Sequence, residues 1–147
     1  MKIEHAESDE QIASTFEVMR QLRPHLVQEE YVPQIRALMA SDGFRLAFLT
    51  DEGEVRAVAG YRYMNMLYCG RLLYVDDLVT DERVRSRGYG ARLLGWLKDE
   101  GRRQGCGELQ LLSRVIREHA HRFYFREGLG IECFQFRIQL LASKEIP

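Results

Sequence analysis

Apolar residues recur along the chain with two spacings, one typical of helices and the other typical of strands. Residues three or four apart share one face of a helix, whereas alternate residues share one face of a strand. Helical spacing predicts helices over residues 8–22, 28–41, 88–104 and 117–128. Alternation and short apolar runs predict strands over residues 2–6, 44–50, 55–67, 71–80, 108–113 and 131–141.

Capping and turn residues support these boundaries. Ser8 and Gln11 have the spacing of a capping box, in which each side chain bonds to the backbone of the other residue. Pro24 follows the first helix, and proline disfavours helix in the residue before it. Gly43 and Gly128 stand where the second and last helices should end. Gly53 lies between two predicted strands and indicates a β-hairpin.

The predicted order is strand, helix, helix, three strands, helix, strand, helix, strand. It combines strands joined by a hairpin with strands joined through a helix, which is typical of an α/β sheet with antiparallel and parallel parts. The length of 147 residues fits a single domain over residues 1–147.

Composition and charge narrow the classes of function. Hydrophobic residues make up 46% and charged residues 29%, as in an ordinary soluble globular protein. A net charge of −1 provides no overall basic field for nucleic acid or for a membrane surface. Three widely spaced cysteines predict neither a disulfide framework nor a zinc site, and they fit a reducing cytoplasm. No apolar run is long enough to span a membrane, and residues 1–10 lack the apolar core of a secretory signal.

The strongest chemical signal is RVRSRGYGARLL, residues 83–94, between a predicted strand and a predicted helix. Gly88 and Gly90 let a ligand approach the backbone closely. The helix start that follows has unpaired N–H groups and a positive dipole end, which together bind phosphate. A dinucleotide fingerprint would need a third glycine where Leu93 stands, and no Gly-Lys-Ser/Thr of a P-loop is present. The segment therefore predicts a phosphate site of another kind.

Arg85, Gly88 and Gly90 form an R-x-x-G-x-G pattern that resembles the signature of the GNAT family of N-acetyltransferases. The resemblance extends over LVTDERVRSRGYGARLL (residues 78–94), AHRFYFREGLG (residues 120–130) and the predicted order of elements. It implies an α/β GNAT fold: a mixed central sheet of about six or seven strands, about four flanking helices, and a splayed strand pair at the coenzyme A site. It also implies an N-acetyltransferase that uses acetyl-CoA and no metal.

The resemblance places coenzyme A along one strand and one loop. The implied cofactor-binding residues are Leu78, Val79 and Thr80 beside the pantetheine arm, and Arg85, Ser86, Arg87, Gly88, Tyr89, Gly90 and Ala91 around the pyrophosphate. Backbone N–H groups of the loop, rather than arginine charge, would hold the pyrophosphate. Arg117 stands where many family members carry an asparagine, so it would reach a phosphate of the cofactor or only solvent.

Direct acetyl transfer needs a neutral amine, an oxyanion donor and an acid for the leaving thiolate. The resemblance implies that the backbone N–H of Leu78 or a near neighbour binds the oxyanion and that Tyr124 is the acid. Helical spacing by itself favours a core position for Tyr124, because it shares a helix face with Ala120 and Phe123.

Asp76 and Asp77 interrupt an otherwise apolar strand, where an unpaired charge is costly. One of them is expected to be the general base, or each is simply paired with an arginine or caps a backbone N–H. Strict alternation puts Asp76 on one face with Tyr74, Leu78 and Thr80, the presumed cofactor side, and so favours Asp76. A single β-bulge would overturn this argument.

The expected function is acetyl transfer from acetyl-CoA to a primary amine of a small molecule, peptide or protein. The alternative is a non-catalytic domain that binds or senses acyl-CoA. Neither nucleic acid nor a membrane is expected as a partner, and an exposed final strand would allow a homodimer. The acceptor is not specified, because selectivity in such a fold depends on the shape of loops.

Overall fold

The sheet built by the first 111 residues follows the order of its strands along the chain. Strands β1 (Lys2–His5), β2 (Arg45–Asp51), β3 (Glu54–Met66) and β4 (Gly70–Thr80) are antiparallel neighbours, and β5 (Glu108–Leu111) pairs in parallel with β4. These elements are seen in a computed structural model of the chain, which describes residues 1–142. A helix connects the parallel pair, as a parallel crossover requires.

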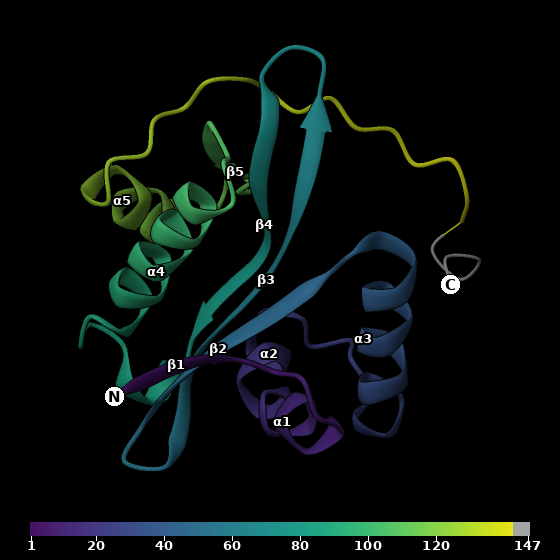
Figure 1. Cartoon of the computed structure of the whole chain (residues 1–147), viewed down its shortest axis with the longest axis vertical. Helices are drawn as coiled ribbons and strands as arrows, with labels where there is room; N and C mark the ends of the chain where they lie inside the picture. Colours follow the sequence, from purple (N-terminus) through teal and green to yellow (C-terminus); the bar gives the residue numbers. More distant parts are fainter. Residues whose placement is uncertain (143–147) are drawn as a thin grey trace. The chain divides into compact units, whose positions relative to one another are not determined.

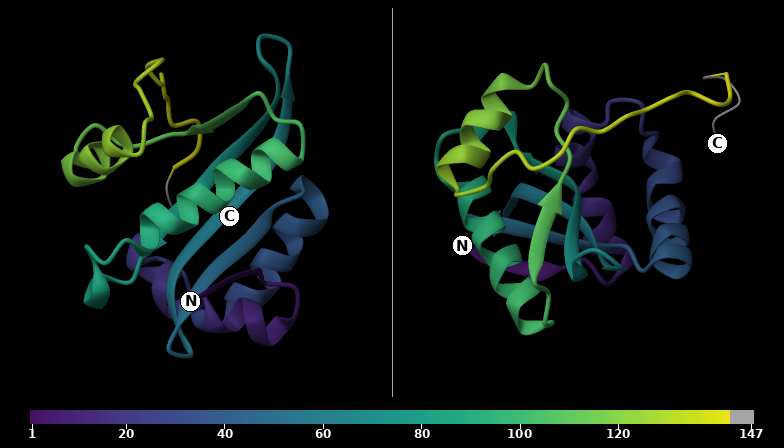
Figure 2. Two further views of the ribbon diagram at one scale, coloured as in Figure 1. Left: turned by 60° about the vertical axis from the view of Figure 1, so that its left-hand side comes forward. Right: turned by 90° about the horizontal axis from the view of Figure 1, so that it is seen from above.

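Helices cover both faces of this sheet (Figure 1). On one face lie α1 (Asp9–Ser14), α2 (Phe16–Leu22) and α3 (Gln28–Asp42), and on the other lies α4 (Tyr89–Arg103). Figure 2 shows α4 in front of the strands that it covers. A short 3-10 helix, η1 (Glu82–Val84), precedes α4, and α5 (Glu118–Arg126) belongs to a second compact unit that starts at Leu112.

Each face of the sheet has its own apolar layer. Phe16 and Ile35, from the helices of the α1–α3 face, join the strand residue Val79 in one core cluster. On the other face, Leu93 and Leu97 of α4 are fully buried. Their spacing of four residues is that of a helix with one apolar face. The two layers hold β3 and β4 in the middle of the molecule's first unit.

Local signals in the sequence predicted several boundaries correctly. The capping box is confirmed, since Ser8 Oγ accepts a hydrogen bond from the N–H of Gln11 at 3.1 Å and Gln11 Oε1 accepts one from the N–H of Ser8 at 3.0 Å. Gly43 ends α3 with a left-handed φ of 64°. Glu52 and Gly53 both have positive φ, 52° and 78°, as the tight β2–β3 hairpin requires.

The structure corrects two predicted elements. The helix predicted over residues 8–22 is divided at Thr15, whose buried hydroxyl donates to the carbonyl of Ile12 at 2.7 Å. The strand predicted over residues 131–141 is wrong, because this segment has no regular secondary structure and belongs to no sheet. Residues 1–142 therefore hold five strands rather than six or seven, and five α-helices rather than four. The α/β class itself is confirmed.

A β-bulge in β4 changes the faces on which its side chains lie. Asp77 pairs with Gly60 and Val75 pairs with Tyr61, so Asp76 is an extra residue between two paired positions. Leu73 consequently lies next to α4, whereas Val79 lies in the core of the α1–α3 face.

Strict alternation had placed Leu73 and Val79 together on one face of β4. The bulge therefore also separates Tyr74 from Leu78 and Thr80. The predicted grouping of Asp76 with all three of these residues is wrong, because an inserted residue reverses the alternation beyond it.

Gly60 lies opposite the bulge, at a point where β3 has no room for a side chain. A Cβ at this position would lie 2.5 Å from Cζ of Phe44 and 2.6 Å from Oδ2 of Asp77. Phe44 is buried in the core of the α1–α3 face. The absence of a side chain at Gly60 thus makes space for both the ring and the carboxylate.

Replacing Gly60 with alanine should lower the free energy of unfolding by about 1–3 kcal/mol, because Phe44 would have to move within a packed core. The control Gly95→Ala should raise it by about 0.5–1 kcal/mol, because Gly95 lies inside α4 and a Cβ there meets no atom within 4 Å. Urea unfolding measures both values. Equal stability of the two variants would contradict the close approach at Gly60.

Candidate functional site

Strands β4 and β5 stop pairing partway along β4. Their parallel register ends at the pair Val75–Leu111, where β5 also ends, whereas β4 continues to Thr80. Within residues 1–142, the segment from Asp76 to Thr80 has a strand neighbour only on its β3 side. Its other backbone edge is able to hydrogen-bond to an extended ligand, as a sheet edge does when it binds a peptide.

The three residues predicted to lie beside pantetheine occupy this half-paired segment of β4. Val79 is buried in the core of the α1–α3 face, and Leu78 and Thr80 are half-buried. The side chain of Val79 is therefore engaged in packing. What the segment offers a ligand is its backbone.

Asp76 and Asp77 begin the half-paired segment, and each carboxylate is paired with an arginine. Arg62 of β3 binds both oxygens of Asp76, with its Nε 3.1 Å from Oδ1. Arg23, which follows α2, donates from Nε to Oδ1 of Asp77 at 2.9 Å. Its Nη2 donates to the backbone carbonyl of Asp76 at 3.0 Å. Both carboxylates are thus held by arginines, which is one of the two roles that the sequence left open.

The two carboxylates have different environments. Burial raises the pKa of Asp77 above the ordinary aspartate value, and the hydrogen bond from Arg23 offsets only part of that rise. Asp42 places a third carboxylate 3.9 Å from the guanidinium of Arg62. Three carboxylates beside two guanidinium groups leave a net negative charge here, which favours a cationic ligand.

The turn from β4 to α4 is anchored at its start by Asp81. This fully buried carboxylate accepts hydrogen bonds from the backbone N–H of Arg83 at 3.1 Å and from its guanidinium at 2.8–3.1 Å. The guanidinium lowers the pKa of Asp81 to about 2. Gln21 of α2 donates to the same carboxylate at 3.3 Å and accepts from the N–H of Glu82 at 2.8 Å. The turn is therefore tied to α2.

Tyr89 anchors the other end of the turn. Its ring is buried, and its hydroxyl donates to Oδ2 of Asp51 on β2 at 2.7 Å. Four consecutive exposed residues stand directly before Tyr89: Arg85, Ser86, Arg87 and Gly88. We call these four residues the exposed loop.

The backbone of the exposed loop is shaped to bind an anion. Ser86 and Gly88 have left-handed φ values of 65° and 82°, and Gly88 is the N-cap residue of α4. Turns of this kind direct successive N–H groups to one side, and the first N–H groups of a helix have no helical partner. A Cβ added at Gly88 would meet no atom within 4 Å, so the space above it is open to a ligand. The loop therefore has the backbone geometry of an anion site.

Two side chains near the exposed loop are bound by carboxylates of other residues. The guanidinium of Arg83 is bound by Asp81, and the hydroxyl of Tyr89 is bound by Asp51. Only the backbone of Tyr89 is thus available to the predicted cofactor.

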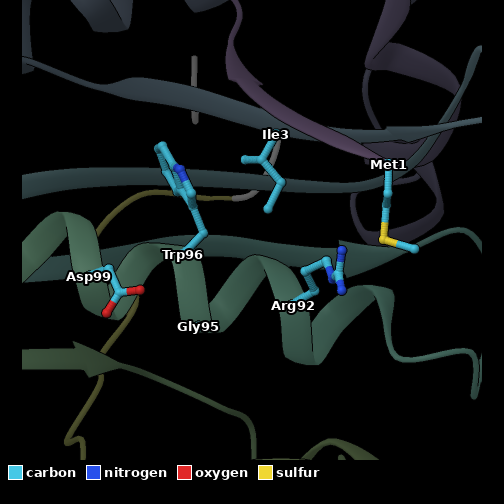
Figure 3. Close-up of a pocket in the computed structure, with 6 residues that line it drawn as sticks. All are labelled: Met1, Ile3, Arg92, Gly95, Trp96 and Asp99. Atoms are coloured by element: carbon cyan, nitrogen blue, oxygen red, sulfur yellow. The ribbon is translucent and has the colours of Figure 1, made fainter.

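A shallow hollow of about 440 Å³ lies between β1 and α4 (Figure 3). It is lined by Met1, Ile3, Arg92, Gly95, Trp96 and Asp99. None of the predicted catalytic or cofactor-binding residues lines this hollow, so it is separate from the half-paired segment and from the exposed loop.

Arg117 and Tyr124 belong to the second unit. Arg117 stands directly before α5, and Tyr124 lies in that helix. Arg117 is an exposed N-cap residue. Tyr124 is half-buried beside Phe123, with ring centroids 5.5 Å apart, and burial raises the pKa of Tyr124. A tyrosine keeps its proton at neutral pH even at its ordinary pKa, so Tyr124 has a proton to donate.

Sequence reasoning did not single out the polar partners that hold the site together. Arg23 and Gln21 are 54 and 60 positions from the aspartates that they bind, and Arg62 is 14 positions away. No local pattern connects residues so far apart.

Two further findings concern the described part of the chain. No group of three or more His, Cys, Asp or Glu side chains among residues 1–142 is arranged to hold a metal ion. In the same residues, every helix is too short or too polar to cross a membrane.

Comparison with known proteins identifies relatives over most of the chain. A family model described as the acetyltransferase (GNAT) family matches residues 10–131. An uncharacterised N-acetyltransferase of Bacillus subtilis, YhdJ, is 34% identical over 131 residues, which cover 88% of this chain and 92% of that protein. An aminoalkylphosphonate N-acetyltransferase of Salmonella typhimurium is 36% identical over 93 residues, covering 63% of this chain and 60% of that protein.

Solved structures with low sequence identity share the fold. A putative acetyltransferase from Agrobacterium tumefaciens superimposes with a TM-score of 0.81 at 22% identity, covering 95% of this chain and 99% of that one. The aminoglycoside N-acetyltransferase AAC(6')-Iy, solved in complex with CoA, has a TM-score of 0.81 at 13% identity, covering 95% of each chain. With the family model spanning residues 10–131 and relatives that are N-acetyltransferases by name, the chain belongs to the GNAT family and is an acetyltransferase.

Proposed function

We propose that the chain transfers an acetyl group directly from acetyl-CoA to a primary amine of a small molecule, peptide or protein. The observation that carries this proposal is the half-paired edge of β4 leading into the exposed loop at the start of α4. A ligand that lies extended along this edge would reach the anion site of the exposed loop. Coenzyme A has this arrangement, because its extended pantetheine arm is joined to a pyrophosphate. Family membership supports acetyl transfer, and the names of the relatives favour an enzyme over a non-catalytic acyl-CoA-binding domain.

Acetyl-CoA supplies an activated acetyl thioester when bound, and the backbone of this chain holds it. The pyrophosphate accepts hydrogen bonds from N–H groups of Arg87, Gly88, Gly90 and Ala91, with Arg85 and Ser86 at the mouth of the loop. Pantetheine pairs with the backbone of residues 78–80, and the N–H of Leu78 binds the oxyanion that develops during attack. We assign Arg117 to a phosphate of the cofactor.

The acceptor amine approaches from the face of the sheet that carries α1–α3. Asp42, Asp76 and Asp77 gather there around Arg23 and Arg62. Their net negative charge attracts an ammonium group before it loses its proton. The Salmonella relative is named for an aminoalkylphosphonate acceptor, which makes small amines the first class to test.

We assign the general base to Asp77 rather than to Asp76, which alternation favoured. Arg62 binds both oxygens of Asp76, whereas Arg23 binds only Oδ1 of Asp77. Burial raises the pKa of Asp77, and a base whose pKa is closer to neutral pH accepts a proton more readily. Tyr124 then protonates the leaving thiolate of coenzyme A.

Acetyl-CoA at about 100 times its Kd should raise the Tm of the parent protein by about 5–10 °C, because it binds only the folded state. Gly88→Val should remove most of this rise by obstructing or reshaping the amide cradle. The control Gly105→Val has the same cost of a positive φ, 73° against 82°, at the far end of α4. It should keep the full shift. If acetyl-CoA does not raise the Tm of the parent protein, or raises that of Gly88→Val equally, the cofactor assignment is wrong.

The kcat/KM of the parent protein should fall at acidic pH as Asp77 gains a proton. Because burial raises the pKa of Asp77, the midpoint should lie above the ~3.9 of an ordinary aspartate. Asp77→Asn should abolish this acidic limb and lower kcat/KM on the order of 10²- to 10⁴-fold. Asp76→Asn should keep the limb. If Asp76→Asn loses it and Asp77→Asn does not, the base is Asp76.

Tyr124→Phe should lower kcat on the order of 10²-fold and leave the thermal shift with acetyl-CoA unchanged, because only the proton donor is lost. Tyr68→Phe, at an exposed tyrosine of the β3–β4 hairpin, is the matched control and should keep full activity. Steady-state thiol release with a panel of amines, including an aminoalkylphosphonate, measures both. Unchanged kcat in Tyr124→Phe would rule out Tyr124 as the acid.

A further inference from the structure

Arg23 binds the start of the half-paired segment of β4 at two points. It donates from Nε to Oδ1 of Asp77 at 2.9 Å and from Nη2 to the backbone carbonyl of Asp76 at 3.0 Å. Arg23 is the C-cap residue of α2, and its φ of −122° and ψ of 73° take it out of helical geometry. A planar guanidinium that binds a carboxylate and a neighbouring carbonyl fixes the orientation of both groups.

Gln21 binds the chain just beyond the other end of the segment. Its Nε2 donates to Oδ1 of Asp81 at 3.3 Å, and its Oε1 accepts from the backbone N–H of Glu82 at 2.8 Å. Asp81 starts the turn that leads to the exposed loop, and Glu82 begins η1. One amide side chain of α2 therefore holds both a buried carboxylate and a backbone group of this turn.

Apolar packing joins α2 to the middle of the same segment. Val79 is buried in the core cluster that includes Val18 and Met19 of α2. Among residues 1–142 the segment has a strand neighbour only on its β3 side. Its position therefore depends more on the contacts from α2 than the position of a fully paired strand would.

We propose that Arg23 and Gln21 are positioning residues for acetyl transfer. Arg23 holds Asp77 where it accepts the proton of the acceptor amine, and Gln21 holds the turn whose exposed loop receives the pyrophosphate. This inference rests on the proposed function, because it takes Asp77 as the base and the exposed loop as the cofactor site. Since both contacts come from the end of one helix, α2 sets the distance between the base and the cofactor, on which the rate of a direct transfer depends.

Arg23 also influences the protonation of Asp77. Burial raises the pKa of this carboxyl, whereas the hydrogen bond and the charge of Arg23 lower it. The other charged or titratable groups of this cluster are Arg62 of β3, Tyr31 and Asp42 of α3, and Asp76 and Tyr74 of β4. Burial raises the pKa of both tyrosines, so they stay neutral, and Arg62 is bound to Asp76. Without Arg23, Asp77 should therefore keep its proton to a higher pH.

Arg23→Met tests the contact with the base, because it removes the guanidinium and keeps a long side chain. The titration of Asp77, followed by NMR of isotope-labelled aspartate without acetyl-CoA or amine, should move to higher pH. The kcat should fall on the order of 10²-fold, and further at acidic pH, because the base is displaced and more of it is protonated. The Kd of acetyl-CoA should not change. Arg20→Met is the matched control on α2, where Arg20 pairs with Glu17, and it should alter none of these values.

Arg23→Lys keeps a positive charge beside Asp77 and serves if Arg23→Met does not fold. It should move the titration in the same direction by a smaller amount, because an ammonium group lacks the fork that binds both groups. An unchanged titration in the Arg23 variants would overturn the role of Arg23 and leave the proposed function standing. A titration that moves without any change in kcat would instead refute Asp77 as the base, and with it the part of Arg23 in the reaction.

Gln21→Met tests the contact with the turn. It should weaken the binding of acetyl-CoA about tenfold, as measured by calorimetry, because the turn would have to be ordered again on binding. The titration of Asp77 should stay as in the parent protein, so the Gln21 and Arg23 variants change different quantities. An unchanged Kd in Gln21→Met would overturn the role of Gln21. A parent protein that does not bind acetyl-CoA would refute the proposed function itself.

Discussion

Among residues 1–142, the backbone of β4 beyond Val75 has one neighbouring strand instead of two, and the other features of the site depend on this constraint. β3 follows β4 to Thr80, while β5 ends at Leu111. Backbone N–H and C=O groups in a partly buried strand are costly to leave without partners. A ligand with amide groups of its own, such as pantetheine, would replace the missing strand. The acyl donor would then complete the sheet as well as bind to it.

The bulge at Asp76 lies at the same point of β4 and determines where the carboxylates go. Regular alternation would put the side chains of Asp76 and Asp77 on opposite faces of β4. With the bulge, Arg62 holds the carboxylate of Asp76 and Arg23 holds that of Asp77. Ionised groups in a half-buried site need such partners, because an uncompensated buried charge costs several kcal/mol. Gly60 opposite the bulge leaves the space that Asp77 occupies. In the mechanism that we propose, Asp77 accepts a proton at this point, beside the half-paired edge of β4.

The exposed loop shows how an anion site can be built from few charges. Asp81 and Tyr89 fix its two ends to α2 and β2, so the backbone between them has little freedom left to lose when a ligand binds. Exposed arginine side chains would have to be ordered on binding, and salt screens their charge. The N–H groups of the loop are already in place. This difference explains why two glycines matter more to the proposed binding than the four arginines around them.

Features that depend on residues close together in the chain were predictable from the amino-acid sequence. The Ser8 capping box, the Gly53 hairpin and the R-x-x-G-x-G loop before α4 are of this kind, because capping and turn geometry involve only three or four neighbours. The bulge, the arginine partners of the two aspartates and the unpaired state of residues 131–141 were not predictable from the sequence. Each of these depends on which segments meet in space. A bulge is a property of two strands, a buried charge takes whichever partner the fold brings to it, and an alternating segment becomes a strand only where another edge lies beside it.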